Sequence, residues 1–478
     1  MSEHIKSKFE PRIKLDEIKF YDTDYGTGTL PEAGIKALEQ RGVEFPHITI
    51  NECSFNQSEV QKMIIDCTNH IPRISLKLLL TTSSKFLTES FPKDGDLISV
   101  FIRGKDDLFK PIRNDYLITS VISNASALTE SDGRGLSISM EGELNIPGLY
   151  NQVLFAKKGN SYQIMEHIAK ELELGFATNI DATDDEMTWI CSYETYLEFM
   201  KHVSGAAWKD KLSFFTFFID VYYHLNFINV NSLINYNAEM LIALAETSII
   251  SSAETPIKTP MGLAEKCFSN GPMYKASNFY IRNYKPINNS SNISKNYGYA
   301  LNILFYDFEN KSNWQLQATN ITTSGAEKDK LLLRGRPGED FYNEQQNYNY
   351  VGMLHNVHEN FYLARAHNLM NNLEMDKLNV QIDTNRVNLN VYRYENMPCV
   401  FFITSDYDRI NKAYENADMQ VQELETPAMA IDKFYTGHYL VKGMTISYTQ
   451  ANANKVSDST LVETFILSRR EWPSPTNK

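Results

Sequence analysis

The stretch "DYLITSVIS" (residues 115–123) alternates apolar and polar residues, which is the period of a β-strand with one buried face. A similar stretch, "HYLVKGMTIS", stands at 438–447, near the other end of the chain. Tyr116-Leu117-Ile118 aligns with Tyr439-Leu440-Val441, although the full alignment needs a slip of a few residues. Such internal similarity indicates a repeated structural unit, and chance similarity between amphipathic strands is the alternative.

The neighbouring sequence favours duplication. An apolar strand precedes each copy, "LISVFI" at 97–102 and "CVFFIT" at 399–404. A polar loop and an alternating strand follow each copy, and each unit ends shortly before a proline, Pro147 or Pro473. These features predict two copies of one small β-domain, in which a hairpin at 47–67 corresponds to a hairpin at 212–231.

Dense strand signals with short turns predict that residues 46–147 form a small antiparallel sandwich or barrel. Strand signals return after residue 376, whereas 283–298 has the composition of a loop. The predicted fold class is mainly β with α+β insertions. The division is an N-terminal extension (1–45), a first β-domain (46–147), an inserted α+β region (148–211 and 246–375), a second β-domain (212–245 and 376–473) and a tail (474–478).

Helices are predicted in the inserted region. "NSYQIMEHIAKELELG" (160–175) has an apolar stripe, an i,i+4 pair of Glu166 and Lys170, and Gly175 as its expected stop. "SYETYLEFMKHVSG" (192–205) has Ser192 as its expected N-cap. A further helix is expected over about 351–372.

The most apolar stretch is "LSFFTFFIDVYYHLNFINVN" (212–231). Asp220, His224, Asn226 and Asn229 interrupt it, and no run approaches the roughly 18 apolar residues of a membrane span. It is therefore predicted to be two buried strands that meet near Asp220, and no membrane insertion is expected.

Composition narrows the possible partners. The formal net charge of −13 argues against a nucleic-acid-binding surface but suits a wall that DNA passes without adhering. The 27 Tyr and 26 Phe favour a β-rich oligomer, although one aromatic core would account for them too.

The cysteines are scattered without a CxxC motif, which favours a reducing compartment, and residues 1–20 lack the apolar segment of a signal peptide.

The segment "HNVHENFYLARAH" (355–367) is the one constellation that suggests chemistry, because HxxH on a helix can hold zinc. Helical spacing, however, places His355, His358 and Glu359 on a polar outer face and directs His367 elsewhere. The acidic run at 184–186 stands in a polar loop, where solvation explains it. No phosphate loop or GxSxG motif occurs. No catalytic, cofactor-binding or metal-binding residue is predicted, and no cofactor.

Several segments, in their order along the chain, resemble the baseplate hub proteins of contractile-tailed, T-even-like bacteriophages. The resemblance covers most of residues 46–473. The segments are "FPKDGDLISVFI" (91–102), "PIRNDYLITSV" (111–121), "SMEGELNIPGLY" (139–150), "SFFTFFIDVYYHLNFINVN" (213–231) and "TGHYLVKGMTISYT" (436–449).

The resemblance implies a structural virion protein with two tail-tube-like β-domains per chain. Three chains would form a pseudo-hexameric ring that joins a six-fold tail tube to a three-fold central spike. The implied partners are the spike, tube or tube-initiator proteins, wedge proteins and the tape measure protein, in a particle assembled in the host cytoplasm. A tail-associated cell-wall hydrolase and a type VI secretion spike-like protein remain open as alternatives.

Overall fold

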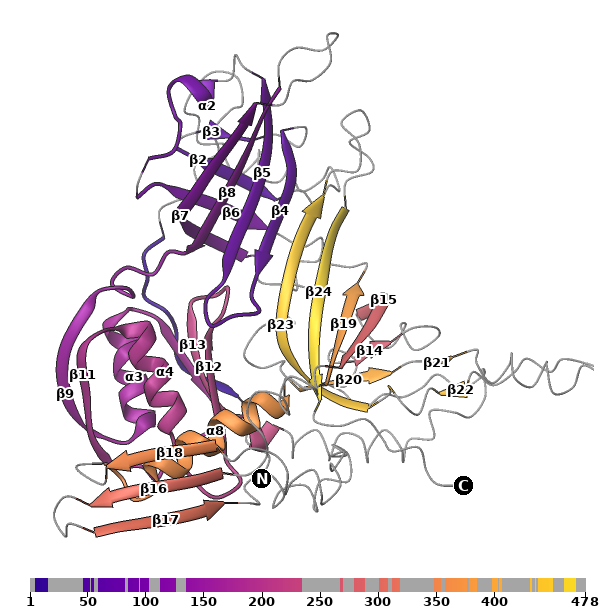
Figure 1. Cartoon of the computed structure of the whole chain (residues 1–478). Coiled ribbons are helices and arrows are strands. Elements are labelled where there is room, and N and C mark those ends of the chain that lie inside the picture. The colour runs from indigo at the N-terminus through magenta and orange to yellow at the C-terminus, as the bar shows by residue number, and fades with distance from the viewer. Residues whose placement is uncertain are drawn as a thin grey trace, which may run out of the picture.

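The computed structural model of the chain is mainly β with few helices over the residues it describes (Figure 1). These are 5–15, 46–51, 53–55, 59–81, 85–93, 95–102, 112–125, 135–233, 267–269, 279–288, 301–307, 312–318, 348–353, 357–375, 378–384, 398–402, 404–405, 430–431, 435, 437–449 and 460–469. No helix among them is long and apolar enough to cross a membrane.

The N-terminal β-domain consists of strands β2 to β8 with one short helix, α2. Their bounds are β2 His47–Ile50, β3 Cys53–Ser54, β4 Val60–Asp66, β5 Arg73–Thr81, α2 Lys85–Thr88, β6 Leu97–Ile102, β7 Ile112–Ala125 and β8 Gly135–Leu144. The described strands pair antiparallel in the order β3-β2-β6-β7-β8-β5-β4. The alternation in β5 buries Ile74, Leu76 and Leu78 as predicted.

The C-terminal β-domain is built from strands that lie far apart in sequence. They are β14 Cys267–Ser269, β15 Phe279–Asn288, β19 Leu378–Thr384, β20 Pro398–Phe402, β23 Gly437–Thr449 and β24 Thr460–Arg469. The described strands follow the order β20-β14-β15-β19-β24-β23, and β20 also pairs with β23, which closes a ring of six strands. Residues 283–288, expected as loop, belong to β15.

The two β-domains share one strand order. In the first the order is β2-β6-β7-β8-β5-β4, and in the second it is β14-β20-β23-β24-β19-β15, so each strand has a counterpart at the same place in sequence and in the sheet. The predicted match of "DYLIT" with "HYLVK" is the match of β7 with β23. The two domains differ in the direction of one strand: β14 runs parallel to β20, whereas its counterpart β2 runs antiparallel to β6.

Register irregularities also coincide. Against β8, strand β7 skips Thr119, and against β24, strand β23 skips Lys442; these positions correspond when Tyr116 is aligned with Tyr439. Against β5, strand β4 skips Gln61, and against β19, strand β15 skips Arg282. Bulges are specific local features of a strand pair, so two shared bulges fix a residue-by-residue correspondence between the domains.

The hairpin expected at 212–231 forms, with β12 Phe215–Ile219 and β13 His224–Asn229 on either side of Asp220. The sequence places it in the second β-domain, but its neighbours are β10 Gly175–Thr178 and β1 Lys6–Phe9, in the order β1-β10-β13-β12. Strand β13 is buried at every position and lies parallel to β10, as suits a central strand covered on both faces. The counterpart of the 47–67 hairpin is instead β14 and β15.

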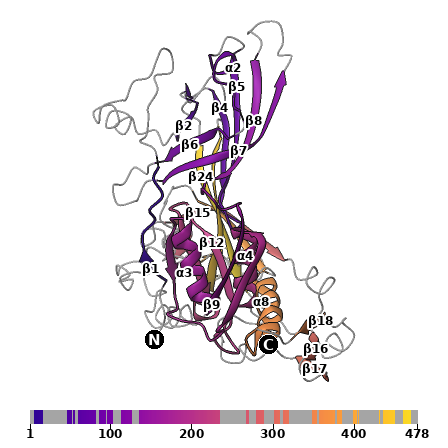
Figure 2. The same cartoon turned by 90° about the vertical axis from the view of Figure 1, so that its left-hand side faces the viewer.

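Helices α3 Ser161–Glu171 and α4 Tyr196–Ala206 pack with this four-stranded sheet and the hairpin of β9 Gln152–Gly159 and β11 Met187–Thr195 (Figure 2). Helix α8 Phe361–Met375 contacts α4 and β12. The remaining described strands are β16 Leu301–Asp307, β17 Ser312–Ala318, β18 Tyr348–Met353, β21 Thr404–Ser405 and β22 Ala430–Ile431.

The sequence predicted the buried face of α3 correctly, but the observed end of α3 and N-cap of α4 differ from those predicted. The predicted stripe of α3 is buried, and Lys170 Nζ lies 2.8 Å from Glu166 Oε1. The helix ends at Glu171, however, and Gly175 starts β10, where an added Cβ would lie 2.5 Å from the His224 ring. The N-cap of α4 is Thr195 rather than Ser192, because Thr195 completes a capping box with the following turn.

Candidate assembly interface

The two β-domains are joined edge to edge by β23 and β4. Thr445–Thr449 pair antiparallel with Asp66–Lys62, and Cys67 N donates to Met444 O at 2.8 Å. Ile65 and Ile446 face each other across this junction, and both are fully buried. The described strands of both domains thereby form one sheet of thirteen strands, whose centre is this junction (Figure 1).

The half of β23 that makes the junction extends beyond β20, while its other edge stays paired with β24. Residues 437–440 pair with β20, and 445–449 continue on the same edge to reach β4. Strand β7 has the same design, because 112–117 pair with β6 and the strand then continues to Ala125. Beyond Ile118, whose N–H donates to Asp96 O, no described strand pairs with this edge of β7.

The counterpart of β4 is β15, and one of its edges meets a described strand only in part. One edge of β15 pairs with β19, and the other meets β14 only at Phe279 and Tyr280. Over residues 283–288 no described strand lies on that second edge. The exposed positions there include Lys285 and Pro286, and Ile287 is half-buried. Charged residues and proline are typical of edge strands.

Hydrogen bonds fasten the sheet β1-β10-β13-β12 to the N-terminal β-domain. Asn114 Nδ2 donates to Val221 O at 2.9 Å, and Asp115 N donates to Tyr223 Oη at 3.2 Å. His70 Nδ1 lies 2.8 Å from Phe217 O, and burial lowers the pKa of His70 despite this bond. These buried contacts fix the position of the hairpin against the β-domain.

A cavity of about 580 Å³ lies where α4, α8 and β12 meet β23. Its described lining includes the cations Lys201, Arg365 and Lys442 but no carboxylate. Lys201 and Lys442 further lower the pKa of the neighbouring His70. The cavity therefore has a positive lining in a chain of negative net charge.

The histidine segment is not an exposed helical face. Helix α8 begins at Phe361, while His358 precedes it and is 8% exposed; its Nε2 donates to Ala206 O at 3.0 Å. His367 is buried edge-on against Trp208. His355 lies outside the described residues. Among the residues the structure describes, no group of three or more His, Cys, Asp or Glu side chains is placed to hold a metal.

The acidic run at 184–186 is not uniformly solvated. Asp185 is fully buried, and its two oxygens accept hydrogen bonds from Ser161 N at 2.8 Å and Trp208 N at 2.9 Å. The carboxylate thus joins the start of α3 to the segment after α4. Because Asp185 stands among polar residues in the sequence, the local pattern did not predict that its carboxylate is buried.

No family profile and no curated protein matches the sequence. Among solved structures, the 43 kDa tail protein of prophage MuSo2 from Shewanella oneidensis matches with 10% identity and a TM-score of 0.46, over 89% of this chain and 98% of that one. A tail protein from Neisseria meningitidis MC58 matches with 9% identity and a TM-score of 0.44, over 89% and 96%.

The E. coli c3393 protein, a component of the type VI secretion system, matches with 10% identity and a TM-score of 0.37, over 90% of this chain and 76% of that one. The chain thus matches phage tail proteins over about nine tenths of its length, as the resemblance in sequence predicted. The backbones agree only loosely.

Proposed function

We propose that this chain is a structural protein of the baseplate hub of a contractile phage tail, which assembles as a trimer with pseudo-six-fold symmetry. The observation that carries the proposal is the pair of β-domains with one strand order and two shared bulges, joined edge to edge in a single chain. Three such chains supply six similar domains, which is the arrangement needed to match a six-fold tube to a three-fold spike.

The channel of such a ring would pass the tape measure protein and then DNA. A wall rich in Lys and Arg would retain DNA by releasing counterions from the phosphates, whereas a chain of net charge −13 suits a neutral or repulsive wall. Acidic residues should therefore outnumber basic ones on the face turned to the three-fold axis. The loops "ESDGRG" (130–135) and "NANKVSDST" (452–460) should lie elsewhere, towards tube or spike.

The test is the mass of the hub–spike complex isolated from assembled tails, measured by native mass spectrometry. We expect three hub chains with three spike chains and no activity on peptidoglycan. The isolated chain is expected to be monomeric at low concentration. Another stoichiometry would refute the trimeric adaptor, and salt-sensitive, tight binding of double-stranded DNA by the ring would refute the proposed channel wall.

A further inference from the structure

The cavity of about 580 Å³ is lined by three separate parts of the chain. The turn between β4 and β5 contributes residues 68–70, strand β23 contributes Leu440 and Lys442, and α4, β12 and α8 contribute most of the rest. Cys67, just before that turn, bonds to Met444 in the junction of β23 with β4. A ligand in the cavity would therefore contact both β-domains and the helices at once, and such boundaries between domains are frequent binding sites.

Cations from three elements line this cavity, and no carboxylate of the described residues does. Lys201 belongs to α4, Arg365 to α8 and Lys442 to β23, and all three residues are exposed to solvent. His70 lies beside them, and its pKa is lowered by burial and by the charges of Lys201 and Lys442. Because the cations come from separate elements and share one recess, their fields add there and favour an anion.

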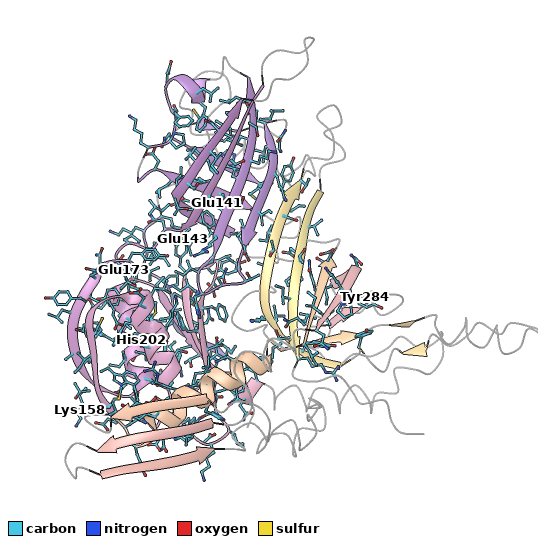
Figure 3. All side chains as sticks on the ribbon, in the orientation of Figure 1. Glu141, Glu143, Lys158, Glu173, His202 and Tyr284 are labelled. Atoms are coloured by element: carbon cyan, nitrogen blue, oxygen red, sulfur yellow. The ribbon has the colours of Figure 1, made fainter. Side chains whose placement is uncertain are left out.

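This positive recess contrasts with the chain as a whole, whose formal net charge is −13. Figure 3 shows the carboxylates of Glu141, Glu143 and Glu173 away from the place where α4 and α8 meet β12. The net charge of the chain repels an acidic partner, whereas the recess attracts it. Charge therefore directs an acidic group of another molecule to this part of the surface.

The bulge of β23 brings Lys442 to the cavity. Strand β23 skips Lys442 in its register with β24, and a bulge turns a side chain out of the regular alternation. At the equivalent bulge of β7 the residue is Thr119, whose hydroxyl donates to Glu141 O at 3.2 Å within the sheet. The Lys442 side chain is open to the cavity, yet the surrounding walls limit its hydration and lower its pKa to about 8. A bound anion would offset that loss of hydration.

The walls beside the cations are apolar and aromatic. They include Phe215 and Phe218 of β12, Leu369 of α8 and Leu440 of β23. Inorganic phosphate has no apolar surface to bury against such walls, whereas a peptide side chain does. The volume lies within the roughly 300–1,000 Å³ of typical ligand pockets, so it admits a short peptide segment but not a nucleic-acid duplex.

The carboxamides that α8 contributes to the lining hold the protein backbone. Asn368 Nδ2 donates to Ala207 O at 2.9 Å, and Asn368 Oδ1 accepts from Phe215 N at 2.8 Å. Asn372 Nδ2 donates to Phe215 O at 3.0 Å. Recognition in this cavity therefore depends on charge and apolar contact more than on these amides.

We propose that the cavity binds a short acidic segment of a partner protein. Carboxylates of that segment would lie beside Lys201, Arg365 and Lys442, and a large apolar side chain between them would pack against Phe215 and Phe218. Ion pairs in such a recess are screened less than those on an open surface. The site lies within one chain, so the inference does not depend on the proposed trimer. A bound segment would hold the two β-domains and the helices in one arrangement.

The test is acetylation of the full chain, read lysine by lysine by mass spectrometry. The probe is the terminally blocked tripeptide Glu-Phe-Glu, with Gln-Phe-Gln as the matched neutral peptide and inorganic phosphate as a simple anion. Glu-Phe-Glu should slow the acetylation of Lys201 and Lys442 roughly threefold or more, because ion pairing withholds the amines. Lys77, which is exposed on β5 and does not line the cavity, should be unaffected.

Charge-neutral variants test the same site by calorimetry. Lys201→Gln and Lys442→Gln should each raise the Kd of Glu-Phe-Glu roughly fivefold, as the loss of one partly screened ion pair implies. Lys77→Gln is the matched control and should leave the Kd unchanged, and thermal unfolding without peptide confirms that each variant is folded. Equal protection by Gln-Phe-Gln or by inorganic phosphate would overturn the proposal, and so would an unchanged Kd in both cavity variants.

Discussion

The packing of the internal junction can be tested at Gly443, which follows the bulge of β23. A Cβ added there would lie 2.9 Å from Thr68 Cα and 3.0 Å from Thr68 Cγ2. Thr68 follows Cys67, whose N–H donates to Met444 in the junction. Since the nearest atom belongs to the backbone, Gly443→Ala requires the chain after β4 to move away from β23.

Two opposing effects set the magnitude. Overpacking a filled site costs about 1–3 kcal/mol. Replacing glycine restricts the unfolded chain and recovers about 0.4–1 kcal/mol. We therefore expect Gly443→Ala to lower the free energy of unfolding by about 1–2 kcal/mol. For a cooperative unit of about 150–250 residues, that corresponds to a decrease in Tm of roughly 2–8 °C.

The assay is thermal unfolding of the full chain together with hydrogen exchange of peptides that cover 62–67 and 444–449. Exchange in both peptides should rise by roughly 5- to 30-fold. Gly205→Ala is the control, because Gly205 lies in α4 with no atom within 4 Å of an added Cβ. That change should raise stability by about 0.5–1 kcal/mol.

The two glycine variants are thus expected to have opposite signs. If Gly443→Ala is as stable as Gly205→Ala and exchange at 62–67 is unchanged, β4 and β23 are not packed as the structure shows. If exchange rises only in 444–449, the two β-domains unfold independently.

Two further predictions concern buried polar groups. Asp185→Ala leaves two buried N–H groups without an acceptor, so it should cost about 2–5 kcal/mol, and Asp185→Asn should cost less; chemical denaturation measures both. Burial lowers the pKa of His358 from its ordinary value near 6.5, so its neutral form is favoured in the fold and stability should fall as pH drops below about 6.5. The loss is at most about 1.4 kcal/mol per pH unit, and His358→Gln should reduce it in unfolding curves recorded at pH 5 to 7; an unchanged pH dependence would contradict the assignment.

The period of the strands could be predicted from sequence because burial alternates along each strand of the β-domains. The bounds of β6 were predicted to the residue, since the turn at Gly95, with φ of +89°, separates it sharply from the preceding loop. The partners of a strand are not encoded locally. The hairpin of β12 and β13 is rich in apolar residues, which predicted its burial but not which sheet contains it.

The main errors of prediction from the sequence concern polar segments, because tertiary contacts decide whether a polar side chain is buried. Asp185 and His358 stand in polar surroundings in sequence, yet each supplies a buried hydrogen bond. Residues 283–288 have the composition of a loop because Pro286 and two asparagines interrupt the pattern. Proline is tolerated in β15 because this part of the strand is at an edge of the described sheet.

Pro286 limits the hydrogen bonds that the edge of β15 can offer to another strand. Its counterpart in β4 is Ile65, whose N–H faces β23 because Cys67, two residues later, donates to that strand. A proline at this position can accept a hydrogen bond but cannot donate one. The edge of β15 at residues 283–288 therefore offers one ladder donor fewer than the edge of β4 that pairs with β23. The missing donor discourages other strands from adding to this edge.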